Sequence, residues 1–190
     1  MSNLTFKIIM LGNSSVGKTS IVNRFIGDRF LSDYKSTIGP DYQFKLLQMQ
    51  GNEVRLEVWD LVGMDTSYKG LNRNFCREAQ GVIMVADIGN MQSIEDTAQW
   101  KQEVDEIVVV NGHPIPIVLC LNKLDTIEGI DESQLDPLQT EEGMREFAQE
   151  HGFFDSYRVS AREDINISAA FSTLTREMII SAINNQHEEE

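Results

Sequence analysis

Short, strongly apolar runs alternate with longer segments of helical periodicity along the chain. Two of these runs, residues 81–87 and 115–121, are apolar at almost every position. Such runs are typical of central strands that are covered on both faces of a sheet. Further strands are expected at residues 4–11, 42–49, 54–60 and 153–159.

Helices are expected between most of these runs, at about residues 17–26, at 93–110, just before Gly152 and at 166–183. Ser93, with Asp96 three residues later, forms a partial capping box for the second of them. Strands that alternate with helices predict an α/β fold with a mostly parallel sheet. The acidic stretch 126–143 has no clear period, and we expect a solvated loop with part of a helix there.

Gly51 and Asn52 separate the strand-like runs 42–49 and 54–60. A turn dipeptide between two such runs predicts a β-hairpin. These two strands are therefore expected to be antiparallel.

The composition narrows the class of protein. The chain has 190 residues, 41% of them apolar, and a net charge of −14 from 30 acidic and 16 basic residues. Such a surface repels phosphate backbones and anionic lipids, so nucleic-acid binding and a polybasic membrane anchor are not expected. Cys76 and Cys120 lie among apolar residues and provide neither a disulfide framework nor a zinc spacing. We expect a cytoplasmic protein of one domain.

One motif follows the first expected strand directly. Residues 12–19, GNSSVGKT, fit the phosphate-loop pattern G-x-x-x-x-G-K-[ST]. Gly12 and Gly17 let the backbone curl so that successive N–H groups converge on phosphate oxygens. Lys18 can neutralise the terminal phosphates, and the Thr19 hydroxyl can bind Mg²⁺. The pattern predicts binding of a nucleoside di- or triphosphate, whereas an ordinary glycine-containing turn is the alternative.

The sequence NKLD, residues 122–125, follows the apolar run 115–121. A carboxylate at this place, Asp125, can accept two hydrogen bonds from guanine, whereas adenine would present a lone pair to it. Because an unpaired buried polar group is costly, guanine is favoured and an ATP-using kinase or ATPase is disfavoured. A backbone N–H of residues 160–162, SAR, could reach the guanine carbonyl.

Together these tracts resemble those of the Ras superfamily of small GTPases, most of all its Rab branch, over residues 4–183. The tracts that carry the resemblance are residues 12–20 (GNSSVGKTS), 36–39 (STIG), 58–60 (VWD), 122–125 (NKLD) and 160–165 (SAREDI). The resemblance implies a P-loop NTPase G domain over residues 1–185. It further implies a six-stranded, mostly parallel sheet with one antiparallel strand and about five helices on both faces.

The resemblance also implies a guanine-nucleotide switch that binds GTP or GDP with Mg²⁺. Its nucleotide contacts would be Asn13, Ser14, Ser15, Val16, Gly17, Lys18, Thr19, Ser20, Phe30, Thr37, Gly63, Asn122, Lys123, Asp125, Ser160, Ala161 and Arg162. Phe30 falls where the family packs a ring against guanine, although a core aromatic is the alternative. Thr37 falls on the switch I threonine that binds Mg²⁺, and Asp60 on the acidic residue that reaches the metal through water. With Lys18 and Thr37, Gly63 would contact the γ-phosphate during hydrolysis.

Rab proteins also share an aromatic patch that faces effector proteins. Tyr42, Trp59 and Tyr68 occupy comparable places here. The resemblance therefore implies effectors, an exchange factor and an activating protein as partners of a monomer, with a buried aromatic cluster as the alternative.

Switch II departs from the family pattern. The family has a glutamine that orients the attacking water, and this chain has Met64, whose thioether is only a weak acceptor. We therefore expect slow intrinsic hydrolysis with nucleotide binding intact. An activating protein could supply a glutamine from outside, and a module locked to its nucleotide without cycling is the alternative.

The C-terminus departs as well. Rab proteins usually end in prenylated cysteines, whereas residues 186–190 here form a short, acidic tail without cysteine. Stable membrane anchoring by this end is not expected. Either the protein acts without a lipid, or the sequence is a G domain from a longer chain.

Overall fold

The computed structural model of the chain describes residues 3–30, 41–61, 73–110 and 112–188. In these ranges, none of the helices has the length and apolar character needed to cross a membrane.

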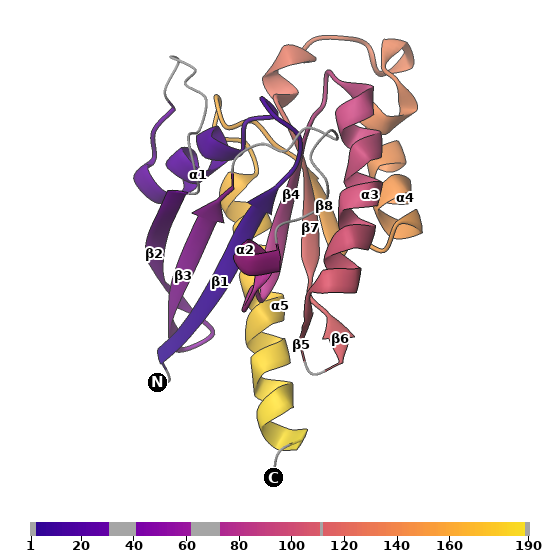
Figure 1. Ribbon diagram of the computed structural model, residues 1–190. Helices are drawn as coiled ribbons and strands as arrows, with labels where there is room; N and C mark the ends of the chain where they lie inside the picture. The colour runs from indigo at the N-terminus through magenta and orange to yellow at the C-terminus, as the bar shows by residue number, and fades with distance from the viewer. Residues whose placement is uncertain (1–2, 31–40, 62–72, 111, 189–190) are drawn as a thin grey trace.

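A six-stranded sheet forms the middle layer of the molecule, with the strand order β2-β3-β1-β4-β7-β8 (Figure 1). The strands are β1 (Asn3–Leu11), β2 (Asp41–Met49), β3 (Asn52–Asp60), β4 (Gly81–Asp87), β7 (Ile117–Asn122) and β8 (Asp155–Arg158). Neighbours are parallel except for β2, which pairs with β3 in an antiparallel register. The mostly parallel sheet with one antiparallel strand is therefore confirmed.

Helices cover both faces of this sheet. They are α1 (Lys18–Gly27), α2 (Arg73–Cys76), α3 (Met91–Ile107), α4 (Glu141–Glu150) and α5 (Ile167–Glu188). α1 and α5 pack on one face, whereas α2, α3 and α4 supply residues to the cluster on the other. The predicted arrangement of helices is confirmed.

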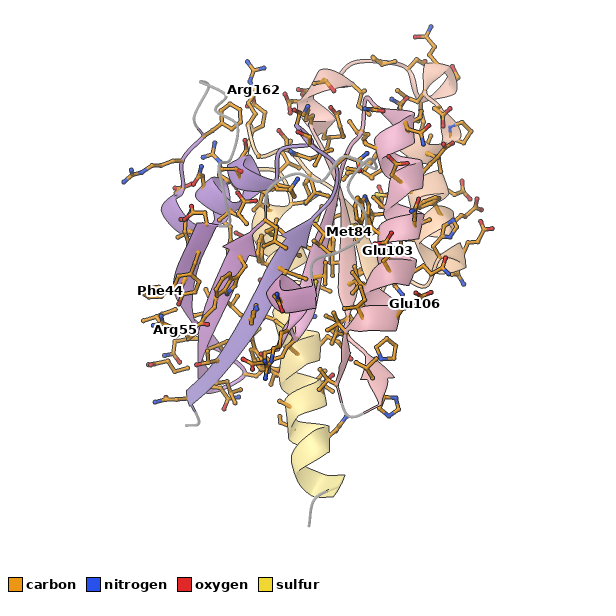
Figure 2. The ribbon with its side chains drawn as sticks, in the orientation of Figure 1. Phe44, Arg55, Met84, Glu103, Glu106 and Arg162 are labelled. Atoms are coloured by element: carbon orange, nitrogen blue, oxygen red, sulfur yellow. The ribbon has the colours of Figure 1, made fainter. Side chains whose placement is uncertain are left out.

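The apolar side chains of the sheet feed one core on each face. β4 and β7 alternate between the two cores and are buried almost throughout, as their continuous apolar runs predict. In the first core, Phe25 of α1 stacks on Phe171 of α5 with ring centroids 3.8 Å apart. In the second, Met84 of β4 packs with Trp100 of α3, and Figure 2 labels Met84 at the centre of the molecule.

Both cysteines are free and buried, as their apolar neighbours predict. Cys76 belongs to the core beneath α3, and burial raises the pKa of its thiol to about 11. Cys120 belongs to the core beneath α5, where complete burial raises the pKa of its thiol still further above the ordinary value. Neither thiol is placed for chemistry.

The hairpin turn lies one residue earlier than predicted. Gln50 and Gly51 form it, with φ of 52° and 76°, and Asn52 already pairs with Met49 as the first residue of β3. A two-residue turn whose twist matches the strands needs positive φ at both central positions. The glycine was correctly assigned to the turn, but its partner there is Gln50.

Helix α3 begins and ends differently from the prediction. Its N-cap is Asn90, whose side chain accepts from the Ser93 N–H, so the assignment of Ser93 as the cap is wrong. The helix ends at Ile107 instead of continuing to residue 110. Val109–Val110 forms the short strand β5, which pairs with β6 (His113–Pro114). A run of β-branched residues favours this extended backbone over a helix.

The acidic stretch 126–143 contains short 3₁₀ turns before α4, which agrees with a loop followed by part of a helix. The turns are η1 (Leu124–Thr126), η2 (Glu132–Gln134) and η3 (Pro137–Gln139). The last two turns and α4 begin at Asp131, Asp136 and Thr140, whose side chains accept from backbone N–H groups. These caps explain why the stretch has order without hydrophobic periodicity.

Truncation of Leu174 tests the contribution of α5 to the first core. Leu174 is fully buried, whereas Ile180 on the same helix is 41% exposed. We expect Leu174→Ala to lower the free energy of unfolding by about 2–5 kcal/mol, because it leaves a cavity as well as losing apolar burial. Ile180→Ala is the control and should cost less than about 1 kcal/mol. Equal urea midpoints for the two variants would contradict this role of α5.

Candidate functional site

The candidate site lies at the carboxyl ends of the parallel strands. The phosphate loop follows β1, Asp60 ends β3, and Asp87 ends β4. The NKLD tract begins with the last residue of β7, and the SAR tract follows β8. In Figure 1 these ends lie at the upper edge of the sheet, beside the start of α1. Open α/β sheets bind ligands at this edge. The fold therefore brings together tracts that are far apart in the sequence.

The phosphate loop needs glycine at both of its marked positions. Gly12 has φ of 135°, and a Cβ there would lie 2.0 Å from the Val85 carbonyl oxygen of β4. Gly17 has φ of 100°, and a Cβ there would lie 2.3 Å from Nδ2 of Asn122. Both the backbone conformation and the close approach of neighbours exclude a larger residue. The loop is thus held tightly against β4 and the NKLD tract.

Helix α1 begins at the end of this loop without a side-chain cap. Gly17 is its N-cap, its first turn has no acidic residue, and within the described residues no side chain caps it. The first N–H groups of a helix lack partners inside the helix and favour an anion in front of them. Ser14 and Ser15 lie exposed at the outer bend of the loop, while Val16 turns into the core and Ser20 is half-buried in α1. The loop can therefore surround an anionic group with backbone donors.

Lys18 is 6% exposed and folds back over the loop. Its Nζ donates to the carbonyl oxygens of Gly12, at 2.9 Å, and Asn13, at 2.8 Å. The ammonium group is therefore fixed against two carbonyl oxygens of the loop that leads into α1. A buried cation that is held in this way favours an anion beside it.

Thr19 and Asp60 form the part of the site that fits Mg²⁺. The Thr19 hydroxyl donates to Oδ2 of Asp60, which is 2% exposed. Among the described residues, no donor reaches Oδ1 of Asp60. Burial raises the pKa of the Asp60 carboxyl, against the opposing effects of the Thr19 hydrogen bond and the Lys18 ammonium. An orphaned buried carboxylate oxygen beside a hydroxyl fits a hydrated divalent cation.

No group of three or more His, Cys, Asp or Glu side chains that could hold a metal occurs in the described part of the chain. A metal at Thr19 would therefore need other oxygen ligands as well. Mg²⁺ is commonly held in this way by one or two side chains, phosphate oxygens and water.

Asn122 joins two loops of the site. Its Nδ2 donates to the Val16 carbonyl in the phosphate loop at 2.9 Å, and its Oδ1 accepts from the Ala161 N–H at 3.1 Å. The side chain is buried and its amide bonds on both sides. The Ala161 N–H, one candidate for the guanine carbonyl, is thus engaged by Asn122 in this structure.

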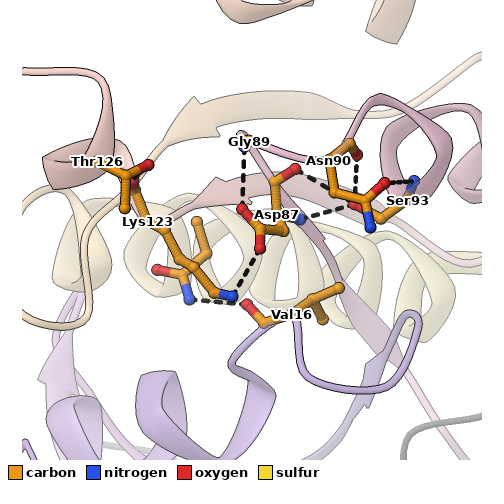
Figure 3. A network of polar contacts seen from close by, with 8 residues as sticks. Val16, Asp87, Gly89, Asn90, Ser93, Lys123 and Thr126 are labelled. Carbon is orange, nitrogen blue, oxygen red and sulfur yellow. Dashed lines mark hydrogen bonds and ion pairs between the residues drawn. The ribbon is translucent and has the colours of Figure 1, made fainter.

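Lys123 is fixed by an ion pair with Asp87, a residue outside the sequence motifs. Its Nζ lies 2.6 Å from Oδ2 of Asp87 at the end of β4 (Figure 3). Asp87 also accepts from the Gly89 N–H, and its backbone bonds the Ser93 hydroxyl. Lys123 itself has φ of 68°, so the backbone turns sharply here. Asp87 is a site residue that sequence reasoning missed; its place at the carboxyl end of an apolar strand was the available signal.

Asp125 faces the SAR tract. Its Oδ1 accepts from the Ser160 hydroxyl at 2.6 Å, and its Oδ2 lies 3.8 Å from Nη1 of Arg162. The Asp125 side chain is only 12% exposed, whereas that of Arg162 is 65% exposed and extends to the outside at the top of Figure 2. The structure therefore brings together Asp125, Ser160 and Arg162.

Phe30 is 39% exposed, so the alternative of a core aromatic is wrong. Tyr42 and Trp59 lie on neighbouring strands with ring centroids 5.3 Å apart; Tyr42 is 40% exposed and Trp59 half-buried. The pair is therefore not a fully buried cluster. Four further candidates, Thr37, Gly63, Met64 and Tyr68, lie outside the described residues.

The outer face of β2 and β3 continues the aromatic surface away from the site. Arg55 lies over the Phe44 ring, 3.9 Å from its centroid, and donates to the Tyr42 hydroxyl at 2.9 Å. Glu57 accepts from both Arg55 and Tyr42. Figure 2 shows Phe44 and Arg55 at the edge of the molecule, on the side of β2. The exposed side chains on this face are therefore held in a defined arrangement.

Comparison with known proteins agrees with this geometry. Residues 7–180 match the model of the Ras family. Ras-related protein Rab-32 of Homo sapiens is 35% identical over 186 residues, which cover 97% of this chain and 79% of that protein. Ras-related protein Rab-7L1 of Homo sapiens is 33% identical over 177 residues, which cover 92% of this chain and 82% of that protein. GTP-binding protein yptV5 of Volvox carteri is 33% identical over 188 residues, which cover 97% of this chain and 85% of that protein.

The family match spans nearly the whole chain, and the similarity to these relatives extends over the same length. The chain therefore belongs to the Ras family and is a Rab-like small GTPase.

Proposed function

We propose that this protein is a guanine-nucleotide switch that binds GTP and GDP with Mg²⁺ and hydrolyses GTP slowly. The observation that carries the proposal is the phosphate loop, which joins the N-terminus of α1, with glycine as its N-cap and no acidic residue in its first turn, to a Lys18 ammonium fixed on the loop backbone. This arrangement attracts an anion in a chain whose net charge is −14.

The phosphates lie against the loop in this proposal. Backbone N–H groups from Ser14 to Thr19 donate to their oxygens, and the Lys18 ammonium faces the β- and γ-phosphates. Thr19 would hold the metal directly and Asp60 would hold it through water, with Thr37 as a further ligand when GTP is bound. When bound, the ion would supply a positive counter-charge for the β- and γ-phosphates.

The base lies between the NKLD and SAR tracts. Asp125 accepts hydrogen bonds from the guanine N1–H and 2-amino group, and the Ser160 hydroxyl holds the carboxylate in position. The alkyl stem of Lys123, fixed at its end by Asp87, covers one face of the base, and the exposed Phe30 ring approaches it from the edge. Adenine would leave Asp125 unpaired, which supports selection of guanine.

Hydrolysis is slow in this proposal because Met64 occupies the position of the water-orienting residue. Lys18 and the Gly63 N–H still stabilise charge on the γ-phosphate, so the reaction keeps its electrostatic support but loses the placement of the water. Relatives named as Rab proteins support a role in vesicle traffic, with effectors that meet the surface of Tyr42, Trp59 and Tyr68.

A second candidate function follows from the same substitution. A module that keeps one guanine nucleotide as a structural part, without cycling, would have no need of a water-orienting residue. Met64 favours this candidate, whereas Thr37, Asp60 and Gly63 favour the switch.

Asp125→Asn tests selection of the base. The variant loses one acceptor towards guanine, and we expect its affinity for GDP to fall at least about a hundred-fold. Xanthosine diphosphate is the matched control, because the side-chain amide of the variant can donate to its 2-carbonyl and accept from its N1–H. Isothermal titration with both nucleotides measures the effect. An unchanged affinity for GDP would contradict the role of Asp125.

Removal of the metal separates the switch from the locked module. For a switch, EDTA should raise the rate of GDP release at least about ten-fold, because the phosphates lose a counter-charge. Thr19→Ala should release GDP quickly with or without EDTA. Exchange of labelled GDP measures both rates, and release that stays slow in EDTA would support the locked module.

Met64→Gln tests the cause of slow hydrolysis. We expect single-turnover hydrolysis of GTP to become about ten-fold to a hundred-fold faster, because the amide can orient the attacking water. Met64→Leu is the control for side-chain size and should hydrolyse GTP at the wild-type rate. Brisk wild-type turnover, or equal rates in all three proteins, would show that Met64 does not limit hydrolysis.

A further inference from the structure

The side chain of Asn13 ties the phosphate loop to helix α3. Its Nδ2 donates to Oδ2 of Asp96 at 2.5 Å, and its Oδ1 accepts from Nε1 of Trp100 at 3.0 Å. Asp96 and Trp100 lie one turn apart on α3, and Trp100 is 5% exposed. One residue of the loop is therefore held on both sides of its amide by a helix more than 80 residues away in sequence.

The backbone of the same residue holds the lysine of the loop. The Asn13 carbonyl accepts from Nζ of Lys18, as does the carbonyl of Gly12. Gly12 is pressed against β4, where its missing Cβ would meet the Val85 carbonyl. The loop is thus fixed at Gly12 by the sheet and at Asn13 by α3.

We propose that Asn13 is a positioning residue, through which Asp96 and Trp100 fix the phosphate loop and the Lys18 ammonium for nucleotide binding. This inference rests on the proposed binding of guanine nucleotide. If the hydrogen bonds of the Asn13 side chain to Asp96 and Trp100 are lost, the loop and the ammonium group can move away from the phosphates. Nucleotide release then becomes faster, whereas the preference for guanine does not change.

The different hydrogen-bonding groups of Asp96 and Trp100 explain why residue 13 has an amide side chain. Asn13 supplies a donor to the Asp96 carboxylate and an acceptor to the Trp100 indole, and a carboxylate there would lose the donor. Asp96 is held in turn by Gln92, whose Nε2 donates to Oδ1 of Asp96 at 2.9 Å. An aspartate at residue 13 would place two carboxylates against each other. Exchange of the two residue types restores every bond, because an asparagine at residue 96 can donate to residue 13 and accept from Gln92.

This exchange gives the test. The rate of release of a fluorescent GDP analogue is measured with Mg²⁺ for wild type, Asn13→Asp, Asp96→Asn and the double variant. We expect Asn13→Asp to release nucleotide about ten-fold faster and the double variant to return to within about three-fold of wild type. Asp96→Asn alone keeps one neutral hydrogen bond between the side chains of residues 13 and 96, and it should change the release rate less than Asn13→Asp does. A double variant as fast as Asn13→Asp would overturn the proposal, because charge beside the phosphates would then explain the effect.

Trp100→Phe removes the indole N–H but keeps a ring in the core, and it provides a second test if Asn13→Asp does not fold. We expect release several-fold faster, with the ratio of GDP to xanthosine diphosphate affinity unchanged. Val104→Ala is the control, since Val104 is fully buried on the next turn of α3. It should lower the unfolding midpoint yet leave the release rate within about two-fold of wild type. If Val104→Ala speeds release as much as Trp100→Phe, general loosening of α3 is the cause and the proposal fails. If wild type binds no GDP analogue at all, the proposed function itself fails.

Discussion

The buried amide of Asn122 is the interaction on which the architecture of the site depends. It donates to the Val16 carbonyl in the phosphate loop and accepts from the Ala161 N–H in the loop after β8. Backbone groups buried away from water must find partners, and here one side chain serves two loops from different strands. Asn122 also lies close to Gly17, where a Cβ would leave no room for its amide. The glycine in the phosphate loop and the asparagine at the end of β7 therefore depend on each other for close packing.

Two lysine side chains of the site are held in place by contacts within the protein. Lys18 bonds to carbonyl oxygens of its own loop, and Lys123 pairs with Asp87. Long, flexible cationic side chains lose conformational freedom when they bind a ligand, and side chains that are already fixed lose less. Helix α3 contributes to both ends of the site, because its N-terminus bonds to Asp87 and its second and third turns bond to Asn13. The acidic surface elsewhere leaves the loop as a local cradle for an anion.

The positions of most strands and helices could be predicted because continuous apolar runs and glycine-rich turns have a direct meaning in the local backbone, whereas the six-stranded sheet with helices on both faces was implied by the resemblance to small GTPases. The two tracts around Asp125 and Ser160 could be placed together because parallel strands end at one edge of a sheet. The end of α3 could not be predicted, since the choice between a last helical turn and the β5–β6 pair depends on a strand that arrives later in the chain. Asp87 and Trp100 were missed for a related reason. Their roles arise from contacts across the fold, and an aspartate after a strand or a tryptophan on a helix has many other uses.

The burial of Cys76 and Cys120 has a practical consequence. Thiol reagents attack the thiolate, and both sulfur atoms are hidden from water and hold their protons. The two natural cysteines of the folded protein are therefore expected to react only slowly with maleimides. A single cysteine introduced at an exposed place on α3, such as Glu106, which Figure 2 labels at the outer side of that helix, would be the only residue to carry a spin label or dye. Distances between labelled helices could then be followed in solution without first replacing either natural sulfhydryl.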